Sequence, residues 1–157
     1  IAIYLLEYWP LIDQWDVEIV SSDIDTKILD QARQGLYSSR SVHNIPQPLL
    51  NKYFKRSGEN FQISKDLREA VEFTRVNLIE PADVKNYRNF DVIFCRNLLI
   101  YFDDVSRRKA AEAMYEAMVP GGFICLGHSE SMSRISSLFR ARKFPETIVY
   151  QKPLGVE

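Results

Sequence analysis

The stretch Phe90–Asp104, FDVIFCRNLLIYFDD, decides how this chain folds, because a charged residue interrupts an otherwise apolar run. Its first part predicts a buried strand over 90–95, and its last part is equally apolar. An unpaired charge is costly to bury, so we expect the strand to leave the core at Arg96. Asn97 follows directly, and Tyr101 comes five residues after Arg96. The interruption therefore predicts the edge of a ligand crevice.

The sequence after this stretch predicts a helix, a strand and a hairpin. Asp103 or Asp104 can cap a helix over 105–118, where apolar residues recur at helical spacing. The triplet Pro120-Gly121-Gly122 is expected to end that helix, and GFICLG predicts another buried strand. LFRARKF and ETIVYQKP, near the C-terminus, predict a closing β-hairpin.

Strands and helices also alternate before this stretch. Residues 17–25, VEIVSSDID, predict a strand that runs into an acidic turn. The next helix is expected to be capped by Asp25 and ended by Gly35. Residues 1–9 read as the later part of a helix, which Pro10 stops.

The segment 36–75 breaks this alternation. It predicts a helix over 47–55, a turn at Ser57-Gly58, and strands at NFQIS and REAVEFTRVNL, the second ending at Asn77.

The alternation predicts an α/β fold with a doubly wound, parallel, Rossmann-like sheet, and the final hairpin adds an antiparallel edge. In such sheets, ligands bind beyond the carboxyl ends of the strands. The polar residues that interrupt apolar runs fall at these ends. They are Asp23, Asp25, Asn77, Arg96, Asn97 and the segment Gly127-His128-Ser129-Glu130.

Composition excludes several classes of function. Twenty basic and twenty-one acidic residues leave a net charge of -1, which argues against a general nucleic-acid partner. No apolar run approaches the ~20 residues of a membrane span, so we expect no membrane insertion. Cys95 and Cys125 have no paired spacing and suggest reduced thiols in a cytoplasmic protein. His43 and His128 have no metal-ligand spacing, so no metal site is expected.

Each candidate site residue also has a purely structural interpretation. Asp23 could accept hydrogen bonds from a ribose or cap the next helix, a role that also suits Asp25. Asn77 could contact an adenine edge or stand in a turn. Arg96 could pair with a carboxylate inside the protein, and Tyr101 could belong to the core.

Other polar residues carry weaker signals. His128 could act as a base, but the GHSES segment could equally be a turn. Arg134, Arg140, Arg142 and Lys143 suit an acidic protein partner or a solvated surface. There is no G-x-G-x-x-G motif, no P-loop and no recognisable nucleophile–base spacing. This inventory fits a chemistry that needs no protein base or nucleophile.

Four segments together resemble the chemotaxis-receptor glutamate methyltransferases of the CheR type. They are SSDIDTKILDQARQGLY, VEFTRVNL, FDVIFCRNLLIYFD and PGGFICLGHSES, in this order and spacing. The resemblance covers nearly the whole chain. It implies transfer of a methyl group from S-adenosylmethionine to glutamate side chains on the cytoplasmic helices of chemoreceptors. The products are glutamate methyl esters and S-adenosylhomocysteine.

The resemblance also implies roles for individual residues. Asp23 matches the acidic residue that holds the ribose, and Asn77 and Leu78 match the pair beside the adenine. Arg96 and Asn97 match the strand-end motif that lines the cofactor pocket. Tyr101 matches the tyrosine near the sulfonium methyl group, so Arg96 and Tyr101 are the candidate catalytic residues.

The implied chemistry agrees with the absence of a recognisable general base in the sequence. A glutamate carboxylate is ionised at neutral pH, so methyl transfer to it requires positioning and exclusion of water. A tyrosine ring favours a cation, and an arginine orients a carboxylate.

The chain departs from the family pattern in its first residues. Family members have a helical N-terminal domain, a first strand and a glycine-rich loop, and none of these is present. We therefore interpret residues 1–157 as a partial methyltransferase domain that lacks the central first strand. We expect this chain alone to be inactive and to bind the cofactor with less than full affinity.

The segment 36–75 corresponds to a small β-subdomain that is inserted in the family. Because KRSGENFQIS is short, we do not expect it to dock a receptor C-terminal pentapeptide. Two other functions stay open: a methyltransferase with another substrate, and a non-catalytic interaction module. Arg96-Asn97-Leu98-Leu99 contains no proline, unlike the strand-end motif common in amino-methylating nucleic-acid enzymes.

Overall fold

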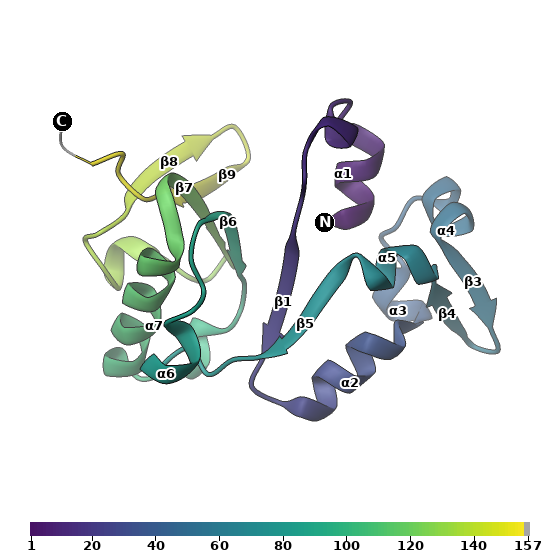
Figure 1. The fold of residues 1–157 in the computed structure, drawn as a ribbon, viewed down its shortest axis with the longest axis horizontal. Helices are drawn as coiled ribbons and strands as arrows, with labels where there is room; N and C mark the ends of the chain where they lie inside the picture. Colours follow the sequence, from purple (N-terminus) through teal and green to yellow (C-terminus); the bar gives the residue numbers. More distant parts are fainter. Residues whose placement is uncertain (156–157) are drawn as a thin grey trace. The chain divides into compact units, whose positions relative to one another are not determined.

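The computed structural model describes residues 1–155, which divide into two compact units: Ile1–Val76, and a second unit that begins at Asn77 (Figure 1). The last two residues of the predicted domain, 156–157, lie outside the described residues. Among the residues that are described, no helix has the length and apolar character needed to cross a membrane.

A parallel strand pair forms the sheet that follows the first helix of the chain. Strand β1 (Ile19–Asp23) pairs with β5 (Val71–Arg75), in register from Ile19 opposite Val71 to Asp23 opposite Arg75. Because the two strands are parallel, their carboxyl ends lie side by side. The strand predicted within 17–25 is confirmed.

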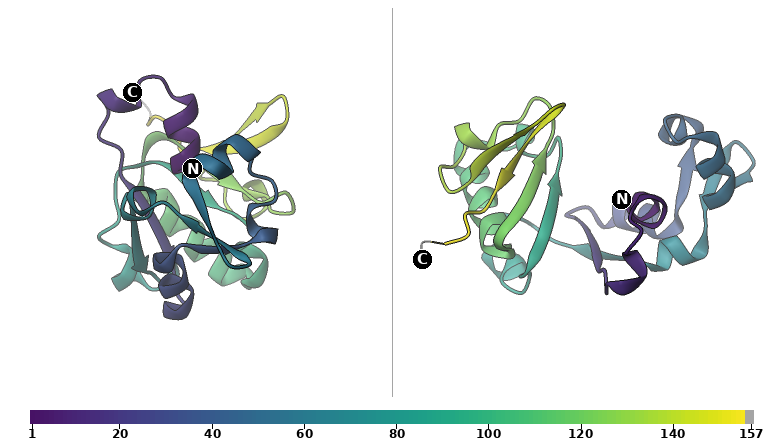
Figure 2. Two further views of the ribbon diagram at one scale, coloured as in Figure 1. Left: turned by 90° about the vertical axis from the view of Figure 1, so that its right-hand side faces the viewer. Right: turned by 90° about the horizontal axis from the view of Figure 1, so that it is seen from above.

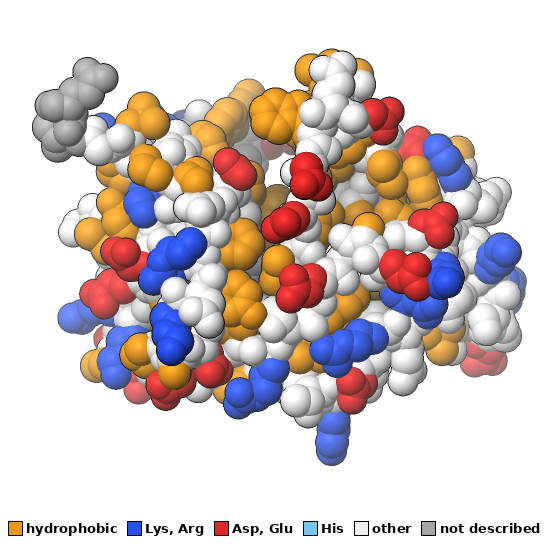
Figure 3. All heavy atoms as spheres, viewed as in Figure 1, with side chains coloured by type: hydrophobic (Ala, Val, Ile, Leu, Met, Phe, Trp, Pro, Cys, Tyr) orange, Lys and Arg blue, Asp and Glu red, His pale blue; other side chains and the backbone are white. Residues whose placement is uncertain are grey.

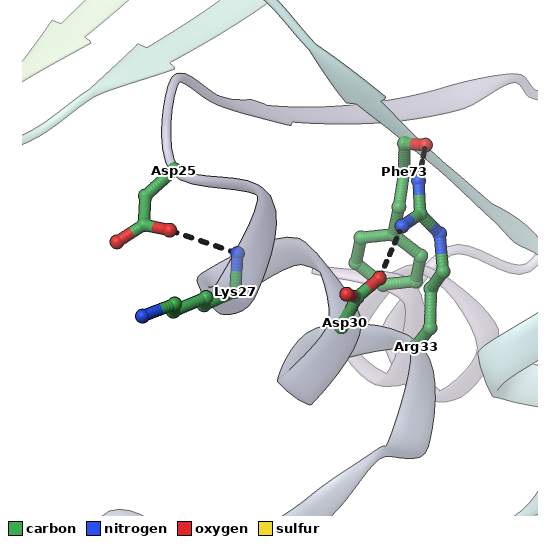
Figure 4. A network of polar contacts seen from close by, with 5 residues as sticks. All are labelled: Asp25, Lys27, Asp30, Arg33 and Phe73. Atoms are coloured by element: carbon green, nitrogen blue, oxygen red, sulfur yellow. Dashed lines mark hydrogen bonds and ion pairs between the residues drawn. The ribbon is translucent and has the colours of Figure 1, made fainter.

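Helix α2 (Thr26–Gln34) has the predicted cap at each end. The Asp25 carboxylate accepts a hydrogen bond from the backbone nitrogen of Lys27 at 2.8 Å, and Gly35 ends the helix with a left-handed φ of 64°. Arg33 donates a hydrogen bond from Nη2 to the carbonyl oxygen of Phe73 at 2.8 Å (Figure 4). This bond ties the helix to β5.

A small antiparallel sheet occupies the next part of the first unit. Its strands follow the order β2-β4-β3, where β2 is Leu36–Ser38, β4 is Asn60–Ile63 and β3 is Phe54–Ser57. Three short helices accompany it: α3 (Ser39–Val42), α4 (Gln47–Tyr53) and α5 (Lys65–Glu69).

The structure divides the predicted segment 36–75 between two sheets. Arg68 and Glu69, expected to be extended, belong to α5 instead, and β5 pairs with β1 rather than with the small sheet. The strand also ends at Arg75, before the predicted Asn77. The hydrophobic periodicity of VEFTR predicts a strand but does not indicate which sheet the strand joins. Its pairing with β1 determines that.

Helix α1 (Ala2–Tyr8) opens the chain and is followed by the short 3-10 helix η1 (Ile12–Gln14). The Glu7 carboxylate of α1 accepts hydrogen bonds from Lys52 Nζ at 2.6 Å and from the Tyr53 hydroxyl. Both bonds lower the pKa of Glu7, that from Lys52 more strongly. They connect α1 to the end of α4.

The second unit contains a four-stranded mixed sheet in the order β6-β7-β9-β8 (Figure 2). Strands β6 (Phe90–Cys95) and β7 (Met118–Leu126) are parallel. Strands β9 (Thr147–Gln151) and β8 (Arg140–Phe144) form an antiparallel hairpin beside β7. This confirms the strand predicted over 90–95 and the closing hairpin.

Helix α7 (Asp104–Ala117) covers one face of this sheet (Figure 2). Asp103 caps it by accepting a hydrogen bond from the backbone nitrogen of Ser106 at 2.7 Å, and this bond lowers the pKa of Asp103. The buried core between helix and sheet joins residues of α7, β6, β7 and β9 with residues of the segments that connect these elements. Its members are Cys95, Leu99, Ala110, Ala111, Met114, Met118, Ile124, Met132, Phe139 and Tyr150.

The triplet Pro120-Gly121-Gly122 was expected to end the helix, but α7 already ends at Ala117 and the triplet lies within β7. The register of β7 against β6 shifts between Phe90 and Val92, which marks a bulge. Gly121 has a φ of 83°, a conformation that suits glycine, and the irregularity therefore stays inside the strand.

Lys152, which follows β9, links the hairpin to the C-terminal end of α7 through hydrogen bonds. Its Nζ donates hydrogen bonds to the carbonyl oxygens of Tyr115 and Met118, both at 2.8 Å. The same atom lies 4.4 Å from the centre of the Tyr115 ring. One side chain thus satisfies two carbonyl groups at the end of the helix.

Strand β6 lies at an edge of its sheet, because β7 is its only strand partner within the described residues. On β6, Val92 is 46% exposed and Phe94 is 53% exposed. Apolar side chains also show at the surface among charged ones in Figure 3.

Candidate cofactor-binding site

Arg96 lies where β6 ends, and its guanidinium group is exposed. It forms no hydrogen bond or ion pair with the residues that the structure describes, so the alternative of an internal carboxylate partner finds no support among them. Its charge acts on the thiol of Cys125 and counters the rise in pKa that burial causes there. A positive charge without a partner at the carboxyl end of a strand is available to an anionic ligand.

Asn97 continues the turn in an unusual backbone conformation. Its φ is 57°, in the left-handed region that asparagine tolerates better than most residues. Its backbone nitrogen donates a hydrogen bond to Oε2 of Glu130 at 2.7 Å. The chain therefore changes direction immediately after Arg96, and the hydrogen bond to Glu130 stabilises this turn.

Glu130 binds three backbone nitrogens with one carboxylate. Its Oε2 also accepts from Gly127 at 2.8 Å, and its Oε1 accepts from Leu99 at 2.8 Å. The sequence placed Glu130 in a polar segment at a strand end but assigned it no role. The only local signal for Glu130 was the order GHSE directly after a strand. Its partners Asn97 and Leu99 lie more than thirty residues away in the sequence, so local patterns do not reveal them.

Gly127 is the closest neighbour of this turn on the β7 side. A β-carbon there would overlap Oδ1 of Asn97 and come within 2.8 Å of Oε2 of Glu130. Glycine is therefore required for the ends of β6 and β7 to approach so closely.

Tyr101 ends the short 3-10 helix η2 (Leu99–Tyr101) and is 79% exposed, which argues against the alternative that it belongs to the core. Leu99, at the start of the same helix, is only 1% exposed and anchors it. Nε of Arg107 donates a hydrogen bond to the carbonyl oxygen of Leu99 at 2.8 Å. The anchored turn thus presents the Tyr101 ring to solvent.

Asn77 combines a turn with an available donor group. Its Oδ1 accepts from the backbone nitrogen of Ile79 at 3.3 Å, and its own backbone nitrogen donates to Asp83 at 3.0 Å. Its side-chain NH₂ group makes no hydrogen bond with the described residues. Leu78 is half-buried and packs against the core of the second unit.

Asp23 lies in the first unit, at the carboxyl end of β1. Its Oδ1 accepts from the backbone nitrogen of Asp25 at 2.9 Å, and Oδ2 accepts nothing from residues 1–155. Asp25, not Asp23, caps α2. The structure therefore removes capping as an explanation for Asp23 and leaves one carboxylate oxygen for a ligand hydroxyl.

The two cysteines are free thiols. Burial raises the pKa of Cys95 to about 12, and the nearby negative charge of Glu130 adds to the effect. Burial also raises the pKa of Cys125. Both thiols are therefore protonated near neutral pH and are poor nucleophiles.

The remaining polar candidates do not join this site. His128 is exposed and makes no hydrogen bond with the described residues. Arg134 lines a shallow hollow with Arg107 and Arg108, whereas the basic residues of β8 are exposed. No group of histidine, cysteine and acidic side chains within the described residues could hold a metal ion.

Arg96, Asn97 and Tyr101 follow β6 on one segment of the second unit, a turn that leads into η2, and Glu130 links that turn to Gly127. Asn77 and Leu78 belong to the same unit, and Asp23 to the other. The second unit thus offers a free cation, an exposed aromatic ring and a donor amide, a set that suits an anionic and heterocyclic ligand.

Residues 1–148 match the family described as "CheR methyltransferase, SAM binding domain". The chain is 54% identical to chemotaxis protein methyltransferase 2 of Vibrio cholerae over 154 residues, which cover 98% of this chain and 54% of that protein. It is 41% identical to chemotaxis protein methyltransferase 2 of Pseudomonas aeruginosa, covering 90% of this chain and 51% of that protein. The chain thus spans about half the length of these curated relatives.

A solved structure described as "Conversion of a Disulfide Bond into a Thioacetal Group during Echinomycin Biosynthesis" resembles the chain in three dimensions. The TM-score is 0.54 at 8% sequence identity, and the match covers 88% of this chain and 68% of that one. At this identity the likeness concerns the fold alone.

Proposed function

The chain belongs to the CheR methyltransferase SAM-binding domain family, and we propose that its protein methylates glutamate side chains of chemoreceptors. The methyl donor is S-adenosylmethionine, and the products are a glutamate methyl ester and S-adenosylhomocysteine. The observation that carries the proposal is the 54% identity to a chemotaxis protein methyltransferase across 98% of the chain. The enzyme acts in the cytoplasm, on the cytoplasmic helices of the receptor, during adaptation in chemotaxis.

The described residues fit the cofactor that the family implies. Asp23 offers Oδ2 to the ribose hydroxyls, and the side-chain NH₂ of Asn77 can donate to a ring nitrogen of the adenine. Leu78 adds an apolar contact, and Arg96 and Asn97 line the methionine end. We propose that these five residues bind the cofactor, and each assignment rests on the local contacts of that residue.

S-adenosylmethionine supplies an electrophilic methyl group on a positively charged sulfur. Arg96 can hold the substrate carboxylate, because its guanidinium has no partner within residues 1–155 and forms paired hydrogen bonds with carboxylates. The exposed Tyr101 ring can face the sulfonium charge. No residue needs to remove a proton, since a glutamate side chain is ionised at neutral pH.

The proposal is tested with the complete protein, tritium-labelled methyl donor and membranes that contain a chemoreceptor. A methyl ester releases volatile methanol in mild base, whereas a methylated nitrogen keeps its label. We expect base-labile label on the receptor, and none on a receptor whose candidate glutamates are replaced by glutamine. Base-stable label would indicate another substrate class, and a complete absence of label would indicate a non-catalytic module.

We also propose that the receptor's C-terminal pentapeptide does not dock on the β3–β4 hairpin. Only Gly58 and Glu59 connect these strands, and Gly58 has a φ of 61°, which gives a tight turn. A pull-down with the immobilised pentapeptide measures this directly. Clear retention of the protein would contradict the proposal.

A further inference from the structure

Resting on the proposed function, we propose that Glu130 is a positioning residue that holds the Arg96-Asn97 turn in the conformation that binds cofactor and substrate. The inference starts from three hydrogen bonds between one carboxylate and the backbone nitrogens of Asn97, Leu99 and Gly127. Glu130 touches no ligand group in this scheme and acts through the turn.

The three bonds join two strand ends that the sheet itself leaves unjoined. The pairing of β6 with β7 runs as far as Cys95 opposite Leu126. Arg96 is the next residue after that last pair on one chain segment, and Gly127 is the next residue on the other, directly after β7. Glu130 therefore continues the connection for the residues on which the proposed site depends, beyond the last sheet contact.

The chemistry of the contact suits a fixing role. A carboxylate accepts hydrogen bonds from backbone N–H groups more strongly than a neutral oxygen does. Three such bonds also compensate a left-handed residue, since Asn97 has a φ of 57° and would otherwise relax. Glu130 is half-buried, and its charge reaches the buried Cys95 thiol, so solvent does not fully screen it.

Each oxygen of the carboxylate has a separate task. Oε2 holds Asn97 and Gly127, and Oε1 holds Leu99, which begins the helix that carries Tyr101. A glutamine has the same shape, but one of its two terminal groups is a donor and cannot accept from N–H. The exchange of Glu130 for glutamine thus breaks part of the network without removing volume.

The experiment uses Glu130→Gln in the complete protein, with Glu116→Gln on the exposed surface of α7 as its matched control. Amide hydrogen exchange is measured first, without ligand. We expect exchange at one or more of Asn97, Leu99 and Gly127 to quicken by about tenfold or more. Exchange at Ile93, within β6, should stay unchanged in both variants, which shows that the fold is intact.

Binding of S-adenosylhomocysteine is then measured by calorimetry, together with a double-mutant cycle that combines Glu130→Gln and Arg96→Ala. If Glu130 acts by positioning Arg96, the two substitutions weaken binding less than additively. We expect Glu130→Gln alone to weaken binding by about tenfold or more and Glu116→Gln to leave it unchanged.

Strict additivity in the cycle would overturn the inference, because a merely structural loss is independent of Arg96. Unchanged binding in Glu130→Gln, with normal binding by the unmodified protein, would also overturn it and leave the proposed function standing. A lack of any binding by the unmodified protein would overturn the proposed function and the positioning role together.

Discussion

Asn97 occupies the space that a β-carbon on residue 127 would need, so its side-chain oxygen and Gly127 fit together only because residue 127 has no side chain. The contact joins the end of β6 to the end of β7, at the residue that directly follows Arg96. A small change at Gly127 is therefore expected to alter the turn on the other strand.

We predict that Gly127→Ala displaces the Asn97 side chain, with a cost of about 1–3 kcal/mol in the free energy of unfolding. Binding of S-adenosylhomocysteine should weaken as well, because the turn beside Arg96 must shift. Chemical denaturation and calorimetry measure the two effects. Gly58→Ala is the control: it has a left-handed φ but open space around it, so it should cost about 1 kcal/mol and leave binding unchanged.

Arg96→Ala should lower kcat/KM for receptor methylation by about 10- to 100-fold, as expected when a charged hydrogen bond is lost. Because Arg96 is exposed and has no partner within residues 1–155, the free energy of unfolding should change by less than about 0.5 kcal/mol. Arg96→Lys keeps the charge without the paired donors and should recover only part of the activity. Full activity in Arg96→Ala would show that this residue does not contact the reacting groups.

Tyr101→Phe and Tyr101→Ala separate the hydroxyl group from the ring. Both should leave thermal stability unchanged, since the side chain is 79% exposed. We expect Tyr101→Phe to lower methyl transfer moderately and Tyr101→Ala to lower it further, because a ring over a cation is worth about 0.5–2 kcal/mol. Initial rates with receptor membranes measure the effect, and equal turnover in all three proteins would exclude a catalytic role.

Asp23→Asn tests the ribose assignment. Asparagine can still accept the hydrogen bond from Asp25 with Oδ1, but its second group is a donor, so the ribose hydroxyls lose an acceptor. Calorimetry should show S-adenosylhomocysteine bound about tenfold more weakly, with α2 intact by circular dichroism. Unaltered affinity would show that Asp23 does not bind the ribose and only stabilises its turn.

Cys95 should make stability depend on alkaline pH. Its folded pKa of about 12 lies above the ordinary thiol value of 9.0, so the unfolded chain loses this proton first. The contribution of the protonated thiol is complete below pH 9 and is lost as the pH rises toward 12, with a slope of at most about 1.4 kcal/mol per pH unit. Urea denaturation of wild type and Cys95→Ala across this range checks it: the stability advantage of wild type should shrink as pH rises.

Local signals in the sequence predicted much of this structure. The caps at Asp25 and Asp103, the strand over 90–95 and the closing hairpin all depend on residues close together in the chain. The polar break at Arg96 marked the strand end correctly. These features follow from backbone conformation and capping, which neighbouring residues determine.

Other features depend on partners that are distant in sequence. The bulge kept Pro120-Gly121-Gly122 inside β7, and β5 joined β1 instead of the small sheet. The hydrogen bonds of Glu130 could not be predicted from local sequence, because two of its three partners are 31 and 33 residues away. The ligand contacts of Asp23, Asn77, Leu78, Arg96, Asn97 and Tyr101 remain predictions for the experiments above.

The attachment of Lys152 to the end of α7 has a practical consequence for following the fold by chemical labelling. Its ammonium group donates to two carbonyl oxygens and lies against the Tyr115 ring, while lysines such as Lys55 and Lys143 are exposed. An acylating reagent should therefore modify Lys152 more slowly than these exposed lysines. Modification of Lys152, detected by peptide mass spectrometry, would then report that the hairpin has separated from the helix.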